Sequence, residues 1–176
     1  MRVEFLGFTI RLMIIGHGDI AGVLNDRTDV IFFASGVSNS KCRDETQFRR
    51  EQNLLVKTYA DYYRPGMSLF YFSTISIAWA TTPYTVHKMK MELSVRALWS
   101  DHTIIRIGNI DWGDNPNTFL NYIRRKHKEG VNVEIRDEWK YMISKGQLLA
   151  ITDNIPAQGK HRLSVFGEMK KVKDLI

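Results

Sequence analysis

The sequence predicts an α/β protein in which a parallel sheet is covered by helices on both faces. Short buried strands and longer helical segments alternate along its 176 residues. A glycine turn, Gly16 to Ala21, directly follows the first apolar strand. Two further apolar strands end in polar loops, at Ser35-Gly36 and at Ser73-Thr74. The exits of parallel strands meet at one edge of a sheet, where ligands bind, so this edge is the predicted site.

The composition is that of one globular domain spanning residues 1–176, with 44% hydrophobic and 25% charged residues. Cys42 is the single cysteine, which excludes an intrachain disulfide and a zinc site built from several cysteines. No metal site is expected. These features favour a reducing, cytoplasmic setting, and no apolar run is long enough to span a membrane.

Residues 8–15 are apolar and β-branched and are stopped by glycine, which predicts a buried strand. The turn that follows has the pattern G-x-G-x-x-A, in which glycines let the backbone approach a pyrophosphate at the start of a helix. A plain strand-to-helix turn is the alternative, and the carboxylate of Asp19 argues against a phosphate. The helix is expected to be short and to end near residues 25–26.

Residues 29–34 predict a second buried strand. Residues 46–63 predict a helix, because aromatic and leucine side chains recur at helical spacing and Pro65-Gly66 stops it. Residues 68–72 predict the third strand, and residues 84–99 predict the next helix. The apolar stripe that we expect to face the core from this last helix is Val86, Met89, Leu93 and Ala97.

The remaining chain continues the alternation. Residues 103–107 predict a fourth strand, with an exit loop from Gly108 to Gly113. After it we expect a helix at 117–129, a strand or hairpin at 131–143, a short helix at 146–152 and a strand at 163–166 before a basic tail.

Part of the net charge of +6 comes from two basic runs, at residues 124–128 and 170–173. Such runs can bind nucleic acid, but a solvated helix end and a basic tail are the commoner explanation. Neither run interleaves with aromatic residues in a nucleic-acid motif, so we do not expect nucleic acid as a partner. A basic surface also suits a nucleotide or nucleotide-sugar ligand.

Tyr84 and Lys88 are four residues apart and therefore share one face of the predicted helix. A phenol beside a cation loses its proton more easily, which suits a general acid/base. The same spacing recurs at Tyr122…Lys126 and at Tyr141…Lys145, so spacing alone decides nothing. Tyr84 is favoured because its helix follows a strand that ends in hydroxyl side chains.

In these segments the chain resembles the extended short-chain dehydrogenase/reductases, the NAD-dependent epimerase/dehydratases that act on nucleotide sugars. The matching segments follow the order of that family. They are the Gly16–Ala21 turn, Ala34-Ser35-Gly36, Ser73-Thr74, Tyr84…Lys88, and Arg106-Ile107-Gly108-Asn109 with Gly113.

The resemblance implies a role for each matching residue. Tyr84 would be the acid/base, and Thr74 would bind the substrate oxygen. Lys88 would hold the nicotinamide ribose and lower the pKa of Tyr84. Ser73 and Asn109 would contact the substrate. The residues that would bind the cofactor, NAD or NADP, are Gly16, His17, Gly18, Asp19, Ile20, Ala34, Ser35, Gly36 and Lys88.

Two departures from the family pattern shape the expected fold. About two strands are missing after the first helix, because one short segment links Gly16 to Asp29. Little chain follows Gly113, so the C-terminal substrate lobe must be vestigial. The chain is thus expected to be a shortened Rossmann-like domain. Ile75-Ser76 stand where the dehydratases carry an Asp-Glu pair, which argues against dehydration.

The favoured interpretation is a minimal NAD(P)-dependent epimerase or ketoreductase acting on a nucleotide sugar. The alternative is a catalytically inactive module of the same fold that binds a nucleotide or a protein. A shortened sheet exposes a strand edge and apolar helix faces. We therefore expect a homodimer formed through the helices at 46–63 and 84–99.

Overall fold

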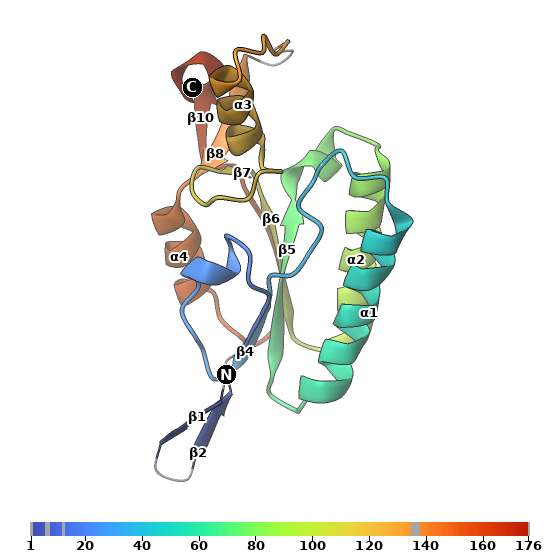
Figure 1. Cartoon of the computed structure of the whole chain (residues 1–176). Helices are drawn as coiled ribbons and strands as arrows, with labels where there is room; N and C mark the ends of the chain where they lie inside the picture. The colour runs from blue at the N-terminus through green and yellow to red at the C-terminus, as the bar shows by residue number, and fades with distance from the viewer. Residues whose placement is uncertain (1, 6–7, 12, 135–137, 176) are drawn as a thin grey trace.

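The computed structural model describes residues 2–5, 8–11, 13–134 and 138–175 (Figure 1). Its centre is a five-stranded sheet in which every neighbouring pair is parallel. From one edge to the other the strands are β3 (Ile14–Ile15), β4 (Val30–Phe33), β5 (Ser68–Thr74), β6 (His102–Ile107) and β9 (Lys160–Val165). The predicted parallel sheet is confirmed.

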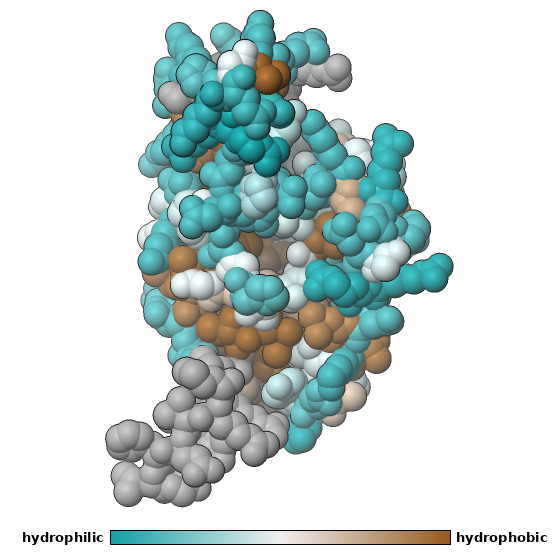
Figure 2. Space-filling view, viewed as in Figure 1, coloured by the Kyte–Doolittle hydropathy of each residue, from teal (hydrophilic) through white to brown (hydrophobic). Residues whose placement is uncertain are grey.

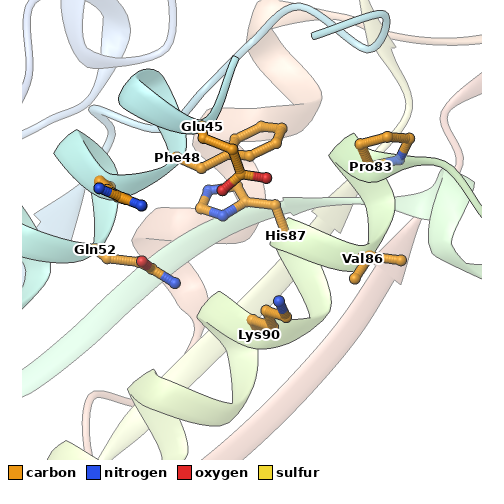
Figure 3. Close-up of a pocket in the computed structure, with 8 residues that line it drawn as sticks. Glu45, Phe48, Gln52, Pro83, Val86, His87 and Lys90 are labelled. Carbon is orange, nitrogen blue, oxygen red and sulfur yellow. The ribbon is translucent and has the colours of Figure 1, made fainter. Parts of the chain in front are cut away.

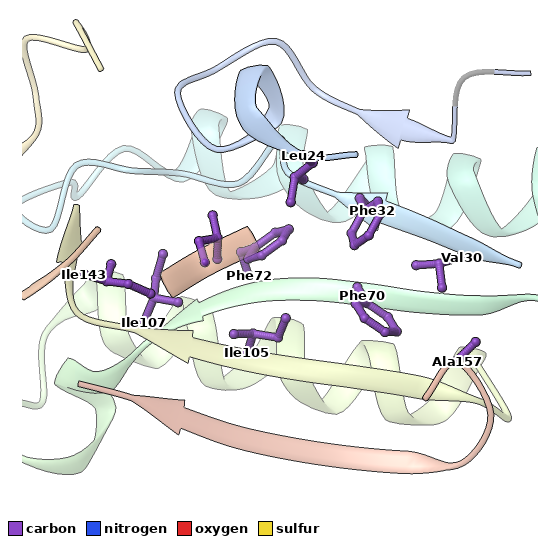
Figure 4. Close-up of a cluster of buried hydrophobic side chains, with 10 residues drawn as sticks. Leu24, Val30, Phe32, Phe70, Phe72, Ile105, Ile107, Ile143 and Ala157 are labelled. Carbon is purple, nitrogen blue, oxygen red and sulfur yellow. The ribbon is translucent and has the colours of Figure 1, made fainter. Parts of the chain in front are cut away.

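Helices cover both faces of this sheet, as the alternation of elements predicts (Figure 1). On one face lie α1 (Glu45–Tyr62) and α2 (Pro83–Leu98). On the other lie α4 (Lys145–Asn154) and the 3-10 turn η1 (Ala21–Val23). Each face has its own core, and the α4 face is filled mainly by aromatic and branched side chains of the strands (Figure 4). Burying each such side chain contributes roughly 1.5–3 kcal/mol.

A smaller lobe follows β6 and carries a three-stranded sheet. In order, its strands are β10 (Glu168–Lys171), β8 (Trp139–Ile143) and β7 (Asn109–Ile110). α3 (Phe119–Lys128) lies beside this sheet and ends in four basic residues, and the visible face of the lobe is mainly hydrophilic (Figure 2). The 3-10 turn η3 (Val172–Leu175) ends the described chain. This lobe is the reduced C-terminal part that the sequence predicts.

The shortening of the sheet appears in its strand order. β3 pairs directly with β4, so the two strands that the family places after its first helix do not occur in the described sheet, as predicted. The expected strand at 8–15 is divided, since Phe8–Arg11 forms β2 of an antiparallel hairpin with β1 (Arg2–Phe5). Only Ile14–Ile15 joins the parallel sheet.

The start of α2 explains how one side chain reaches the sheet edge. Thr82 accepts a hydrogen bond from the Thr85 backbone N–H at 3.2 Å, and the Thr85 hydroxyl accepts one from the Thr82 N–H at 2.8 Å. This capping box, with Pro83 at the first helical position, fixes where the helix begins. Tyr84 is thereby held in the first turn of α2, beside the end of β5.

The structure corrects the apolar stripe expected on α2. Leu93 is 61% exposed and Met89 is 37% exposed, whereas Met91 and Val95 are fully buried. Both sets have helical spacing, but the buried stripe also contains Lys88, which makes it look polar in the sequence. Lys88 is tolerated there because a buried carboxylate faces it, as described below.

Three shorter segments also differ from expectation. The strand expected at 131–143 is formed only by β8 at its end, and residues 135–137 lie outside the described residues. The expected basic tail contains β10, whose lysines pair with β8. The third difference is the 3-10 turn η2 (Ile75–Ala78), which follows β5 and was not predicted. None of the helices in the described ranges is long and apolar enough to cross a lipid bilayer.

Candidate functional site

The structure brings Thr74 and Tyr84 together at the carboxyl end of β5. Thr74 is the last residue of that strand, and Tyr84 lies in the first turn of α2. Both are buried, and the Thr74 hydroxyl is close enough to Tyr84 to lower the pKa of its phenol. The Thr74 hydroxyl also accepts the backbone N–H of Ser76 at 3.2 Å, which fixes its direction. Two predicted catalytic hydroxyl groups therefore meet where parallel strands end.

The pKa of Tyr84 is shifted in the opposite direction to the expected one. Burial raises the pKa of Tyr84 well above its ordinary value, and the charge of Glu51 adds to the increase. The neighbouring Thr74 hydroxyl lowers it, but does not compensate. The expectation that Lys88 lowers this pKa is wrong, because the Lys88 charge is neutralised by Glu51.

Glu51 of α1 is the group that neutralises Lys88. Lys88 Nζ lies 3.0 Å from Glu51 Oε1 and 3.1 Å from the Tyr71 hydroxyl, and both charged side chains are buried. Burial by itself raises the pKa of Glu51, but the Lys88 charge and the hydrogen bonds to the carboxylate lower it to about 2. Glu51 is therefore ionised at neutral pH and forms a neutral pair with Lys88.

Four donors surround the Glu51 carboxylate. Besides Lys88 they are the Tyr71 hydroxyl at 2.8 Å, the Val37 backbone N–H at 2.7 Å and His87 Nε2 at 2.9 Å. A carboxylate only accepts, so the Nε2 of His87 carries the hydrogen. The His87 ring stacks on Phe48 with 4.4 Å between ring centroids. This network joins α1, α2, β5 and the loop after β4.

Sequence reasoning did not identify Glu51, His87 and Tyr71 as parts of the site. A usable signal exists for Glu51, which is four residues before Leu55 and three after Phe48. It is therefore a charged residue on the apolar stripe of a predicted helix. Such a residue is seldom buried without a partner of opposite charge.

Ser73, predicted to contact the substrate, forms a hydrogen bond within the fold. Its hydroxyl donates to Glu92 Oε1 at 2.7 Å, on the face of β5 that packs against α2. Arg106 of β6 donates to both oxygens of the same carboxylate. The Ser73 hydroxyl is committed to this contact between the sheet and the helix.

The glycine turn lies at the predicted edge, but it does not open an α-helix. The three-residue turn η1 follows it, because only a short chain returns from Gly16 to β4. Gly16 has φ +134°, and a Cβ there would lie 2.4 Å from the carbonyl oxygen of Ala34. The loops that follow β3 and β4 are therefore in contact. The expected helix N-terminus for a pyrophosphate is not formed.

Asp19 connects this turn to the loop after β7. Its carboxylate accepts the backbone N–H groups of Asp114 and Asn115, each at 3.2 Å. Its carbonyl oxygen accepts the indole N–H of Trp112 at 3.1 Å. Asn115 in turn donates to the Ser38 hydroxyl at 3.1 Å. Three exit loops are thus fastened to one another above the sheet edge.

The loop Ala34–Gly36 covers the Lys88 pair. A Cβ on Gly36 would lie 2.5 Å from Lys88 Nζ and 2.9 Å from Glu51 Oε1, so a larger residue would displace the charge pair. Arg50 of α1 donates to the Ser35 carbonyl oxygen at 2.9 Å and holds the loop from the other side. This backbone contact explains the glycine at position 36.

Asn109 begins β7, where the main sheet meets the small lobe. Its amide donates to the Tyr141 carbonyl oxygen at 3.2 Å, so it fastens β8 to β7. Gly108 packs closely beside it, since a Cβ there would lie 2.9 Å from the same carbonyl oxygen. Asn109 thus lies at the junction between sheet and lobe, and a substrate contact remains a prediction.

The residues fit a dinucleotide cofactor in part. A Cβ on Gly18 would meet no atom within 4 Å, so the backbone of the turn is open to a ligand. His17 is also exposed, and Ile20 packs against the core below the turn. Asp19 opposes a phosphate by its charge. In the described part of the chain, no group of three His, Cys, Asp or Glu residues is placed to hold a metal ion.

A separate cavity of about 200 Å³ lies between α1 and α2 (Figure 3). His87 and Phe48 point into this region from the two helices, with polar side chains around them. The lining residues are Glu45, Phe48, Arg49, Gln52, Pro83, Val86, His87 and Lys90. The back of the Glu51 network thus forms part of its wall.

Fold and site together define a Rossmann-like α/β protein with a Thr-Tyr-Lys set at the carboxyl edge of its sheet. Its fold is that of the NAD-dependent nucleotide-sugar epimerases of the extended short-chain dehydrogenase/reductases. Comparisons with protein-family models and with curated proteins return no match.

Several solved structures carry this likeness. The enzyme WbmG of Bordetella bronchiseptica in complex with NAD has a TM-score of 0.57 and 16% identity, covering 83% of this chain and 53% of its own. UDP-glucose 4-epimerase of Thermus thermophilus, also with NAD, has a TM-score of 0.59 and 15% identity, covering 84% and 59%. UDP-N-acetylglucosamine 4-epimerase of Methanobrevibacter ruminantium, in complex with UDP-N-acetylmuramic acid, has a TM-score of 0.59 and 13% identity, and the match covers 89% of this chain and 61% of that structure. The chain thus matches little more than half of each structure.

Proposed function

We propose that this chain binds NAD or NADP and acts as a minimal epimerase or ketoreductase on a nucleotide sugar. The observation that carries the proposal is the buried pair of Thr74 and Tyr84 hydroxyls at the end of β5, with Lys88 one helical turn further along α2. A paired donor and acceptor at this position suits proton transfer to or from a carbinol or carbonyl oxygen. Nucleotide-sugar enzymes with the same fold support the substrate class.

All of the predicted residues except Ser73 have a place in this proposal. Residues 16–20, with the open backbone at Gly18, would hold the pyrophosphate, and the Ala34–Gly36 loop would lie along the cofactor. Lys88 would bind the nicotinamide ribose, and Asn109 would contact the substrate. A nicotinamide, when bound, supplies hydride transfer at the substrate carbon. Thr74 would orient the substrate oxygen, and Tyr84 would move its proton.

The second candidate is a catalytically inactive module that binds a nucleotide or a protein partner. Two contacts favour it. Lys88 is occupied by Glu51, and the Asp19 carboxylate fills the backbone N–H groups of the loop at 114–115. The first contact occupies the ammonium that would bind the nicotinamide ribose, and the second fixes a carboxylate in the turn that would hold the pyrophosphate.

The decisive experiment is direct binding of NADH and NADPH, followed by energy transfer from tryptophan to the reduced nicotinamide. Trp112 should report cofactor binding, since its indole N–H donates a hydrogen bond to the carbonyl oxygen of Asp19 in the glycine turn. Micromolar binding of either cofactor supports the proposed activity and justifies a screen of nucleotide sugars. The absence of binding at millimolar concentration would instead favour the inactive module.

A matched pair of variants assigns the binding site. Trp112→Phe should reduce the energy transfer while a calorimetric titration still detects the cofactor. Trp139→Phe, in the small lobe, should leave the transfer nearly unchanged. Equal transfer in the two variants would place the nicotinamide away from the predicted edge.

A homodimer through α1 and α2 remains part of the proposal. Val56 on α1 and Leu93 on α2 are more than half exposed, and Met89 lies one turn before Leu93. Large apolar side chains on neighbouring helices suit an interface between two copies. Sedimentation should detect a dimer at micromolar concentration, and Leu93→Lys should dissociate it. A monodisperse monomer of the unmodified chain would refute this assembly.

A further inference from the structure

A buried carboxylate determines where the Lys88 ammonium lies. Glu51 is fully buried, and its Oε1 accepts both Lys88 Nζ and the Tyr71 hydroxyl. The Tyr71 hydroxyl donates to Glu51 and accepts from Lys88, so the three groups form a closed triangle. The ammonium is thereby anchored on Tyr71, 5.1 Å from the centre of that ring and 6.0 Å from the centre of the Tyr84 ring.

The charged and titratable groups around this triangle come from every element packed on it. α2 contributes His87, Lys88, Tyr84 and Glu92, β5 contributes Tyr71, and the loop after β4 contributes the Val37 N–H. The Glu51 and Lys88 charges cancel. A tyrosinate at position 84 would therefore add an uncompensated negative charge to a buried site, which is unfavourable.

We propose that Glu51 is a positioning residue: it anchors the Lys88 ammonium on Tyr71 and so controls how readily the Tyr84 hydroxyl loses its proton. This inference rests on the proposed function and deepens it, because it names a residue outside the predicted site that would set the acidity of the proposed acid/base.

The backbone above the pair supports a fixed ammonium. The space between the Gly36 backbone and Lys88 Nζ does not accept even a Cβ, so the loop holds the ammonium against Glu51. The Val37 N–H fastens the same loop to the carboxylate at 2.7 Å. Lys88 therefore approaches Tyr84 only if its contact with Glu51 is lost.

The test titrates Tyr84 itself and needs no cofactor. Tyrosinate absorbance is followed against pH in the unmodified chain and in Tyr84→Phe, and the difference between the two is the contribution of Tyr84. The same difference is measured with Glu51→Gln in both chains. Removing the Glu51 charge leaves Lys88 unpaired. The rise in absorbance when Tyr84 ionises, here called the Tyr84 step, should therefore occur at least about one pH unit lower.

Two further variants distinguish positioning from a general loss of structure. Adding Lys88→Met to Glu51→Gln should return the Tyr84 step to the alkaline range, because no unpaired cation remains. Glu45→Gln, which removes an exposed charge from the same helix, should not move the step. Tyr71→Phe keeps the charge pair but removes the anchor, and should give a smaller downward shift than Glu51→Gln.

An unmoved Tyr84 step in both Glu51→Gln and Tyr71→Phe overturns the proposal. The result is independent of the cofactor-binding experiment. If no nicotinamide binds but the step moves, the proposed activity fails and the control of Tyr84 by Glu51 stands. If a nicotinamide binds and the step does not move, the activity stands and the role of Glu51 is refuted.

Discussion

Arg106 of β6 and Glu92 of α2 form a two-point ion pair that ties the sheet to a helix. Arg106 Nε lies 2.8 Å from Glu92 Oε1, and Nη2 lies 2.6 Å from Oε2. Ser73 of β5 donates to the same carboxylate. Two residues predicted from family motifs, Ser73 and Arg106, therefore meet at a structural contact.

Glu92→Gln should destabilise the fold because it removes the carboxylate that both donors require. A hydrogen bond to a charged group contributes about 1.5–3 kcal/mol, so we expect a loss of roughly 2 kcal/mol in urea unfolding. Arg106→Lys should lose less, because a lysine keeps the charge but not the two-point geometry. Asp61→Asn breaks an exposed ion pair with Lys57 and should leave the unfolding midpoint unchanged. Equal stability of Glu92→Gln and Asp61→Asn would contradict this structural role.

Acid should weaken the fold through Glu51. Its folded-state pKa is lowered from 4.5 to about 2, so its contribution to stability is complete above about pH 5 and is lost as the pH falls towards 2. The difference between the two pKa values corresponds to on the order of 3 kcal/mol. Urea unfolding at a series of acidic pH values should show this loss in the parent chain, and a smaller loss in Glu51→Gln.

A double variant provides the control for that measurement. Glu51→Gln alone leaves the buried Lys88 ammonium without a counter-ion, which typically costs about 3–5 kcal/mol. Glu51→Gln with Lys88→Met removes both charges and should be more stable than the single variant at neutral pH. If the double variant were the less stable one, the pair would contribute more than mutual neutralisation.

Most of the sheet could be predicted from the sequence because its strands are uninterrupted apolar runs that alternate with helices. Val30–Phe33 and Ser68–Thr74 are entirely buried, which is the pattern of a central parallel strand. β10 was missed because Glu168–Lys171 is mainly polar and becomes a strand only by pairing with β8. The hairpin of β1 and β2 was missed because the apolar run at 8–15 was predicted as one continuous strand.

The site was predicted less completely than the fold. Strand exits and helix spacing bring Thr74 and Tyr84 together, and both features are local in the sequence. The state of Lys88 depends on Glu51, which is 37 residues away and meets it only after α1 and α2 pack. The role of Asp19 likewise depends on backbone groups of a distant loop. Such long-range polar contacts leave no periodic signal.

Gly113 and Asp19 should show strongly coupled effects on stability. Gly113 has φ +89°, and a Cβ there would lie 2.1 Å from Asp19 Cγ. Gly113→Ala should therefore cost about 1–3 kcal/mol from backbone strain, together with displacement of the carboxylate. In an Asp19→Gly background the steric part disappears, so the same change should cost less in urea unfolding. Gly146→Ala, where a Cβ meets no atom, is the control and should not destabilise the helix. Equal penalties for Gly113→Ala in both backgrounds would show that the two loops do not pack as described.

Tyr84→Phe separates the proposed chemistry from folding. The phenyl ring fills the same buried space, and only the hydroxyl beside Thr74 is lost, so stability should fall by no more than roughly 1 kcal/mol. Loss of a general acid should reduce kcat by roughly 10²–10⁴-fold, while cofactor binding changes little. Tyr122→Phe, on α3, makes the same chemical change outside the candidate site and should leave kcat nearly unchanged. Turnover of a nucleotide sugar at an unchanged rate in Tyr84→Phe would remove Tyr84 from the mechanism. In that case the hydroxyl pair would serve only to join β5 to α2.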